Sequence, residues 1–270
     1  VLVVGAGISG ILAAKNAAKN NYKTLLLDEK NELGGSTIYE NNESNKIDNK
    51  ISSEWLKEEI KELKNIKNLE IKTRTSVAAY HQYNYLLARE NLTDHLEKKY
   101  KTNKIRQRLL KIRAKKVILA TGALERPMVF NNNDRPGIML SSAIKKYSDF
   151  YGVACGRKIA FFTNNDSAYE SALSLNDKGI KVEAIVDIRK QSETNLEKRV
   201  IDSGIKIYWE HTVVDTSGYK RLNNISIMKL SNDGTSVTGN KISISCDCLG
   251  VAGGWTPAVH LYTQSGNKLT

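Results

Sequence analysis

Short apolar runs separated by Ala-rich and polar segments dominate the start of this chain. Val1–Val4 is continuously apolar and largely β-branched, which is typical of a buried parallel strand. Ile11–Lys19 is Ala-rich and favours a helix, and Lys23–Asp28 is a second apolar strand that ends in an acid. The pattern therefore predicts a strand–helix–strand unit that ends near Lys30.

The next part of the chain predicts one more helix and several strands. A helix is expected to begin near Ser53, because apolar residues recur at the helical period and Ser52 or Ser53 can act as the N-cap. Asn41–Lys50 is polar and Asn-rich, which predicts a mobile surface loop. The apolar positions of the helix are Trp55, Leu56, Ile60 and Leu63. The expected strands are Leu69–Thr73, Val77–Leu87 and Leu109–Ile112, the last two as an antiparallel excursion, and Val117–Gly122.

A second strand–helix–strand unit begins after Gly156. Its segments are Lys158–Thr163, Ser167–Lys178 and Lys181–Asp187. The intervening loop, Thr163–Ser167, contains no glycine, so Cβ atoms would obstruct a pyrophosphate and Asp166 would repel it. This unit is predicted to keep the fold without binding a dinucleotide. Later short strands are expected at Lys206–Glu210, Ile225–Leu230, Lys241–Ser245 and within Leu249–Pro257.

The first unit carries a G-x-G-x-x-G motif between its strand and its helix. Gly5 permits the tight turn, Gly7 lets the backbone approach a pyrophosphate, and Gly10 permits close helix–strand packing. The helix N-terminus supplies N–H groups and the positive end of the dipole. Asp28, 18 residues after Gly10, stands where a carboxylate receives ribose hydroxyls. Together these residues predict a dinucleotide site, over which the Leu33–Ser36 turn can close.

Composition supports this interpretation. The 270 residues are 40% hydrophobic and 26% charged, as in ordinary globular proteins, and no apolar run approaches membrane-helix length. From the residues at its two ends, the chain is expected to be a piece of a longer polypeptide. The only cysteines, Cys155, Cys246 and Cys248, form no disulfide framework, which favours a cytoplasmic location. Cys246 and Cys248 are expected on one side of a strand as core thiols, and the lack of Cys-x-x-Cys argues against a dithiol reductase.

The net charge of +12 is concentrated in Lys98–Lys116, where Lys and Arg fill ten of nineteen positions. Aromatic residues are sparse there and no nucleic-acid motif is present, so a solvated or subunit-facing hairpin surface is the preferred interpretation over a nucleic-acid groove. The four histidines show neither metal-ligand spacing nor a nucleophile partner. The sequence therefore nominates neither a catalytic residue nor a metal ligand.

Several longer stretches resemble the alpha subunit of heterotetrameric sarcosine oxidase. The resemblance rests on motifs spread over nearly the whole chain. These are Lys111–Lys115 leading into Ala120–Pro127, Phe130–Leu140, Phe162–Tyr169 with its Thr-Asn-Asn-Asp-Ser loop, and Gly253–Leu261. The resemblance implies an α/β protein with a Rossmann-like FAD/NAD(P)-binding fold and a second, inserted Rossmann-like domain of the pyridine nucleotide-disulfide oxidoreductase type. The first domain is expected at 1–140 and 246–270, incomplete at its C-terminal end, and the insert at 141–245.

The resemblance also implies which residues line the cofactor. NAD is the expected cofactor, with FAD in the same pocket as the alternative, and Asp28 disfavours the 2′-phosphate of NADP although Lys30 weakens that preference. The implied site comprises Gly5, Gly7, Ser9 and Gly10 at the pyrophosphate, Asp28, Glu29 and Lys30 at the ribose, Gly35 and Ser36 on the far side, Val77 near the adenine, and Thr121 and Gly122 beside the cofactor.

The family oxidatively demethylates sarcosine to glycine, forming hydrogen peroxide and, with tetrahydrofolate, methylenetetrahydrofolate. The resemblance implies beta, gamma and delta partner subunits, an FAD on the beta subunit and an FMN near the alpha–beta interface. Opine oxidase and hydrogen cyanide synthase subunits share the same dinucleotide core and remain alternatives. A non-catalytic, nucleotide-bearing assembly platform is a further alternative, and neither nucleic acid nor membrane is expected as a partner.

Overall fold

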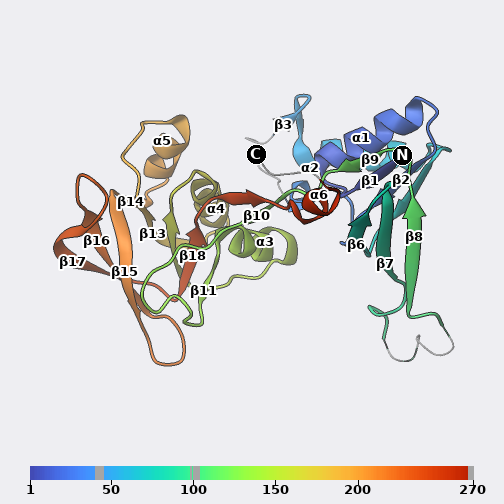
Figure 1. Cartoon of the computed structure of the whole chain (residues 1–270). Helices are drawn as coiled ribbons and strands as arrows, with labels where there is room; N and C mark the ends of the chain where they lie inside the picture. The colour runs from blue at the N-terminus through green and yellow to red at the C-terminus, as the bar shows by residue number, and fades with distance from the viewer. Residues whose placement is uncertain (40–45, 98, 100–103, 267–270) are drawn as a thin grey trace. The chain divides into compact units, whose positions relative to one another are not determined.

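The computed structural model describes residues 1–39, 46–97, 99 and 104–266, and the chain divides into two compact units (Figure 1). The first unit contains Val1–Ala123 and Pro257–Thr270, and the second contains Leu124–Thr256. The chain passes between them in β10 (Ala123–Glu125) and β19 (Trp255–Pro257), which pair with each other. The second unit is therefore an insertion into the first.

The first unit is built on a parallel sheet in the order β5-β2-β1-β9. Helices α1 (Ile8–Lys19) and α2 (Ser52–Leu63) cover one face, where Val3 and Leu26 of the sheet pack with Ile11 and Trp55. The strands are β1 (Leu2–Val4), β2 (Thr24–Leu27), β5 (Leu69–Lys72) and β9 (Val117–Leu119). The first predicted strand–helix–strand unit is confirmed, with α1 starting three residues earlier than the Ala-rich run indicates.

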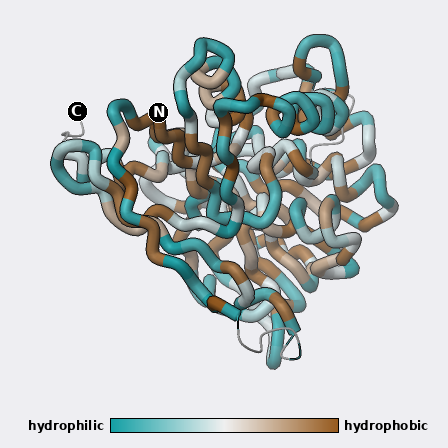
Figure 2. Tube along the Cα trace, turned by 90° about the vertical axis from the view of Figure 1, so that its right-hand side faces the viewer, coloured by the Kyte–Doolittle hydropathy of each residue, from teal (hydrophilic) through white to brown (hydrophobic). Residues whose placement is uncertain are grey.

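The other face of this sheet carries the predicted antiparallel excursion. It consists of β6 (Thr75–His81), β7 (Tyr85–Asn91) and β8 (Gln107–Arg113), in that order. Leu86 and Ala88 of β7 are fully buried against Leu2 and Leu27, and Leu261 of α6 (His260–Gln264) joins the same cluster. Figure 2 shows hydrophobic stretches concentrated along the strands and hydrophilic ones along the loops. The unit thus has three layers: helices, parallel sheet and antiparallel sheet.

Two local predictions in this unit need correction. Ser52 lies inside α2 and the N-cap is Ile51, which makes no side-chain capping bond. Of the predicted loop Asn41–Lys50, the part up to residue 45 lies outside the described residues, whereas β3 (Lys46–Ile47) and β4 (Lys50–Ile51) form a short antiparallel pair. A 3₁₀ turn, η1 (Thr37–Tyr39), precedes that segment.

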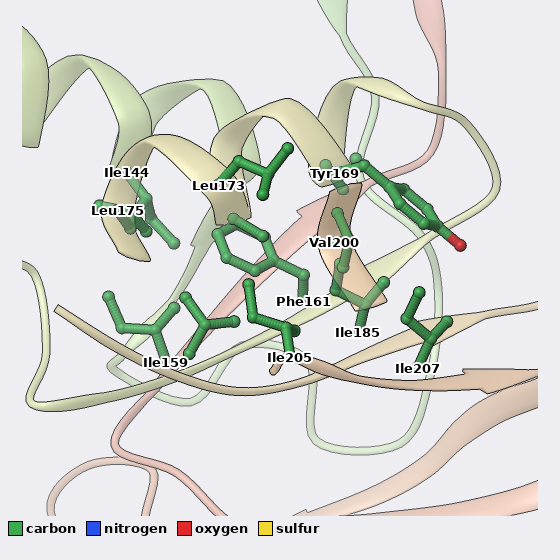
Figure 3. Close-up of a cluster of buried hydrophobic side chains, with 14 of the residues drawn as sticks. Ile144, Ile159, Phe161, Tyr169, Leu173, Leu175, Ile185, Val200, Ile205 and Ile207 are labelled. Carbon is green, nitrogen blue, oxygen red and sulfur yellow. The ribbon is translucent and has the colours of Figure 1, made fainter. Parts of the chain in front are cut away.

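The second unit repeats the same three layers. Its parallel sheet has the order β11-β18-β12-β13-β14, with helices on one face and an antiparallel sheet, β15-β16-β17, on the other. Figure 3 shows Ile159 and Phe161 of the sheet facing Leu173 and Leu175 of α4. The parallel strands are β11 (Ile138–Leu140), β12 (Lys158–Thr163), β13 (Lys181–Asp187), β14 (Lys206–Trp209) and β18 (Cys248–Ala252). The remaining elements are α3 (Ser141–Tyr151), α4 (Ser167–Asn176), α5 (Asn195–Asp202), β15 (His211–Ser217), β16 (Asn224–Leu230) and β17 (Val237–Ser245).

The units divide at Ala123/Leu124 and at Thr256/Pro257, whereas the sequence places the insert at 141–245. The difference arises because β11 and β18 pair with each other and β18 pairs with β12, so both strands belong to the sheet of the second unit. The sequence pattern did not predict α5, although Thr194 and Glu197 form its capping signal: the Thr194 hydroxyl accepts a hydrogen bond from the Glu197 N–H. None of the described helices is long and apolar enough to cross a lipid bilayer.

Candidate dinucleotide site

Gly5, in the loop between β1 and α1, and Gly10, in the first turn of α1, are required by the fold itself. Gly5 has φ +97°, and a Cβ built there would lie 2.2 Å from the carbonyl oxygen of Ala120. A Cβ at Gly10 would lie 1.8 Å from the carbonyl oxygen of Gly5. No side chain fits at either distance, so these glycines allow α1 and β9 to pack closely around the turn.

Gly7 is different, because nothing in the described part of the protein requires a glycine there. Its φ of −70° and ψ of −177° are accessible to any residue, and a Cβ would meet no atom within 4 Å. Gly7 is the N-cap of α1, where no side-chain capping bond is made and the first turn carries no acid. This N-terminus therefore presents backbone N–H groups and the positive end of the helix dipole to an open space suited to an anion, which we call the cradle.

The turn that contains Gly34 and Gly35 forms a second wall of this cradle. The N–H of Gly34 donates to the carbonyl oxygen of Ala6 at 2.7 Å. Gly35 has φ +63°, and a Cβ there would lie 3.1 Å from the Cα of Gly7. Ser36 follows with an exposed side chain. The structure thus brings Gly35 beside Gly7, and the roles of Gly35 and Ser36 on the far side of the site stay predictions.

Asp28 lies beside the same loop at the end of β2. Its carboxylate accepts hydrogen bonds from the backbone N–H of Ala6 at 2.6 Å and of Lys30 at 2.8 Å. A carboxylate has about four acceptor sites, so these two bonds leave capacity for ribose hydroxyls. The side chains of Glu29 and Lys30 are exposed. The ribose end of the predicted site is therefore anchored to the glycine loop before any ligand binds.

The remaining predicted residues are placed less directly. Thr121 donates its hydroxyl hydrogen to the carbonyl oxygen of Ala258 at 2.7 Å, and Gly122 accepts from the N–H of Ala258. Gly122 has φ +69° and open space where a Cβ would lie. Val77 packs its side chain into the core beneath the antiparallel sheet, so any contact with an adenine would come from its backbone. The cofactor-binding roles of Ser9, Val77, Thr121 and Gly122 stay predictions, as do those of the other residues of the implied site.

The corresponding loop of the second unit is closed by its own side chains. Asn165 accepts a hydrogen bond from the N–H of Ser167, the first residue of α4, and donates to the carbonyl oxygen of Ala252. The hydroxyl of Thr163 donates to the carbonyl oxygen of Asn165 and accepts from its N–H. Amide and hydroxyl groups thus occupy the N-terminus that a pyrophosphate would need.

Asp187, at the end of β13, is the counterpart of Asp28 and is also engaged internally. Its side chain is 1% exposed and accepts from the guanidinium of Arg189 and from the hydroxyl of Tyr169. Arg189 also reaches Asp166 in the loop at 2.8 Å. Burial, together with Asp187, raises the pKa of Tyr169, and the bond to Asp187 raises the pKa of Arg189. One arginine therefore bridges the positions equivalent to a ribose site and a phosphate loop.

A buried carboxyl that the sequence did not single out lies in the second unit. Glu125 is 8% exposed, and one of its oxygens accepts from the N–H of Ser142 in the first turn of α3 at 2.8 Å. Its other oxygen and the hydroxyl of Ser141 are buried without a partner among the described residues. Burial raises the pKa of Glu125. Elsewhere in the described part of the chain, His, Cys, Asp and Glu form no group suited to a metal ion.

Comparison with known proteins identifies the family. Residues 1–270 match the family described as pyridine nucleotide-disulphide oxidoreductase. The chain belongs to this family. Over its whole length it is also 37% identical to the sarcosine oxidase subunit alpha of Corynebacterium sp. (strain P-1) and 36% identical to that of Corynebacterium sp. (strain U-96), of which it covers 27% and 28%.

The chain therefore spans about a quarter of the length of the curated relatives it matches. Among solved structures, the thioredoxin reductase of T. acidophilum has a TM-score of 0.73 at 18% identity, with 100% of this chain and 81% of that one covered. That likeness concerns the fold alone. The Rossmann-like fold of the family and the resemblance to sarcosine oxidase alpha subunits are both confirmed.

This member of the oxidoreductase family carries no Cys-x-x-Cys pair. Contrary to the sequence prediction, Cys246 and Cys248 lie on opposite faces of the sheet, Cys246 toward β15–β17 and Cys248 toward the helices. The chain leaves the β16–β17 ladder at Cys246, whose N–H donates to Asn223, before β18 begins. Both thiols are buried, as expected of core thiols, and burial raises the pKa of each to about 12, which opposes thiolate chemistry.

Proposed function

We propose that this chain is the dinucleotide-binding segment of a sarcosine oxidase alpha subunit and that it holds NAD at the glycine loop of its first unit. The observation that carries the proposal is Gly7, which has ordinary backbone angles and no neighbour where a Cβ would stand. The fold tolerates a side chain there, so a bound group is the best reason for glycine at this position. FAD in the same pocket is the alternative cofactor.

The residues present fit such a group. The N-terminus of α1 and the turn at Gly35 would hold the pyrophosphate, and Asp28 would accept the hydrogens of the ribose hydroxyls. The anchored carboxylate of Asp28 would repel a 2′-phosphate, which favours NAD over NADP. A bound NAD supplies a nicotinamide ring that can exchange a hydride. The chain's own contribution is to bind and orient the nucleotide.

In the proposed complex, which we place in the cytoplasm, sarcosine is oxidatively demethylated to glycine with formation of hydrogen peroxide and methylenetetrahydrofolate. The beta subunit would carry FAD and the amine oxidation, FMN would lie near the alpha–beta interface, and the C-terminal part of the alpha chain would carry the folate chemistry. Gamma and delta subunits would complete the complex. Opine oxidase and hydrogen cyanide synthase subunits remain alternatives within this class. The internally bonded Asn165 loop and the Asp187–Arg189 pair of the second unit favour a platform role for this segment within the complex.

Gly7→Val in the full-length alpha subunit, purified with its partner subunits, tests the proposal. The Cβ of the valine would meet no described protein atom within 4 Å, so the fold should persist while NAD retention is lost. Nucleotide released by denaturation is identified and quantified by chromatography. Leu12→Val, on the exposed face of α1, is the matched control and should retain NAD. Full retention of NAD by a folded Gly7→Val protein would refute the site, and release of FAD would favour the alternative cofactor.

A further inference from the structure

The antiparallel sheet of the first unit has one face that packs on the core and one that does not. Three cross-strand rows face inward: Thr75–Glu90–Arg108, Val77–Ala88–Leu110 and Tyr80–Leu86–Ile112. Three alternate rows face outward: Ser76–Arg89–Leu109, Ala79–Leu87–Lys111 and His81–Tyr85–Arg113. We call the outward rows the outer face. Its exposure follows from the strand period, because alternate residues of one strand point to opposite sides.

The outer face carries positive charge and no acid. Arg89, Lys111 and Arg113 are exposed on it, and within the described residues none of them forms an ion pair. The one acid of the sheet, Glu90, is on the inward side, where it is 8% exposed and engages Lys72 and Arg108. The sheet therefore separates charge across its two faces: the inner acid is neutralised, and the outer cations are unopposed.

Apolar groups lie among these cations. Leu109 is 62% exposed, whereas Leu110 and Ile112 of the same strand pack against the core. It faces outward because Leu109 and Leu110 are neighbours on one strand and only one of them can point inward. Leu87 and Tyr85 are half-buried on the outer face. Arginine and tyrosine around an exposed leucine match the composition of protein interface cores more closely than that of a solvated surface.

We propose that the outer face docks an acidic surface of another protein subunit, with Leu109 at the centre and Arg89, Lys111 and Arg113 as charge partners. The identity of the partner rests on the proposed function, which places this chain in a multi-subunit complex. A second copy of the chain is disfavoured, because a twofold contact would set this basic face against itself. A nucleic acid is disfavoured because Arg113 lies over the ring of Tyr85, 5.7 Å from its centroid, where a base would stack.

The test uses the full-length alpha subunit and its separately purified partner subunits. Lys111→Glu/Arg113→Glu reverses two charges of the outer face, and Leu109→Glu places a charge at its centre. Lys190→Glu/Lys198→Glu makes the same change in net charge at exposed positions of the second unit and is the matched control. Dissociation constants are measured by calorimetry at 50 and about 300 mM salt. Both outer-face variants should weaken assembly by about tenfold or more, and the control should not.

Salt and folding readouts complete the design. Raising the salt should weaken wild-type assembly and affect the charge-reversed variant less, because screening acts on the charges that the variant has lost. Unchanged thermal unfolding and NAD retention of each variant show that the fold and the nucleotide site persist. NAD retention tests the proposed function, and the dissociation constants test the docking inference. Failure of one can therefore be distinguished from failure of the other. Four results would each overturn the inference. The outer-face variants could bind the partner subunits as tightly as the wild type, or the control could weaken assembly as much as they do. The wild type could bind no partner subunit, or a DNA duplex of about 20 base pairs could compete for the outer face.

Discussion

Replacing Arg189 with methionine should destabilise the second unit by about 2–3 kcal/mol. Asp187 is 1% exposed, and the substitution removes the guanidinium bonds to both of its oxygens, at 3.1 and 2.8 Å. Breaking a buried pair costs about 3–5 kcal/mol. The cost here is smaller because Asp187 keeps the hydroxyl of Tyr169 and the N–H of residue 189, and because the Arg189 side chain is 36% exposed. Loss of the exposed pair with Asp166 adds less than about 1 kcal/mol.

Urea unfolding of the chain, followed by the combined fluorescence of Trp55, Trp209 and Trp255, measures this loss, and Trp209 lies in the second unit at the end of β14. A cost of this size corresponds to a midpoint shift of about 1 M urea. Arg189→Met combined with Asp187→Asn should recover most of the stability, because no unpaired charge is then buried. Lys198→Met removes an exposed cation from α5 and should leave the midpoint unchanged. A wild-type midpoint in Arg189→Met, or no recovery in the double variant, would refute the reasoning.

Two further changes test the second unit. Asp166→Asn should leave the affinity of the complex for NADH and NADPH unchanged, because Asn165 already closes this loop; a changed affinity in a titration would contradict that prediction. Burial raises the pKa of Glu125, so its ionisation opposes folding and stability should fall as the pH rises from the unfolded value of about 4.3 through the raised folded value. Glu125→Gln should remove this component and stabilise the chain at pH 7. If urea unfolding gave the same dependence of stability on pH for Glu125→Gln and the wild type, this role of Glu125 would be excluded.

The glycine motif shows how far local sequence can be taken. Its spacing predicted the loop, the helix and the acid of the first unit, because a tight turn, close packing and an uncapped N-terminus depend on residues that are near in sequence. It also assigned Gly5 and Gly10 to the turn and its packing and Gly7 to the pyrophosphate. The contact that leaves no room for a side chain at Gly5 was not visible in the sequence, because it is made by Ala120, which β9 brings beside the loop from more than 100 residues away.

The second unit also contains contacts that the sequence pattern did not predict. The missing glycines of Thr163–Ser167 indicated a loop unsuited to a pyrophosphate, but the sequence assigned no partner to Asp166. The structure instead pairs Asp166 with Arg189, which also engages Asp187. Such a bridge depends on the ends of β12 and β13 being adjacent in the sheet. Cys246 and Cys248 were placed on one side because strict alternation assumes one continuous strand, and the chain changes sheets between them.

The sequence by itself determined the two strand–helix–strand units, the antiparallel excursion and the dinucleotide motif, because helix and strand periods and turn residues act over a few neighbouring positions. Only the tertiary structure decided where the inserted unit begins, which atoms leave no room for a side chain at Gly5, and which face of the β6–β8 sheet is left exposed. These features arise from pairing between distant strands: β11 with β18, β9 with β1, and β8 with β7. Contacts of that kind depend on how the whole chain buries its apolar residues, and local spacing does not record them.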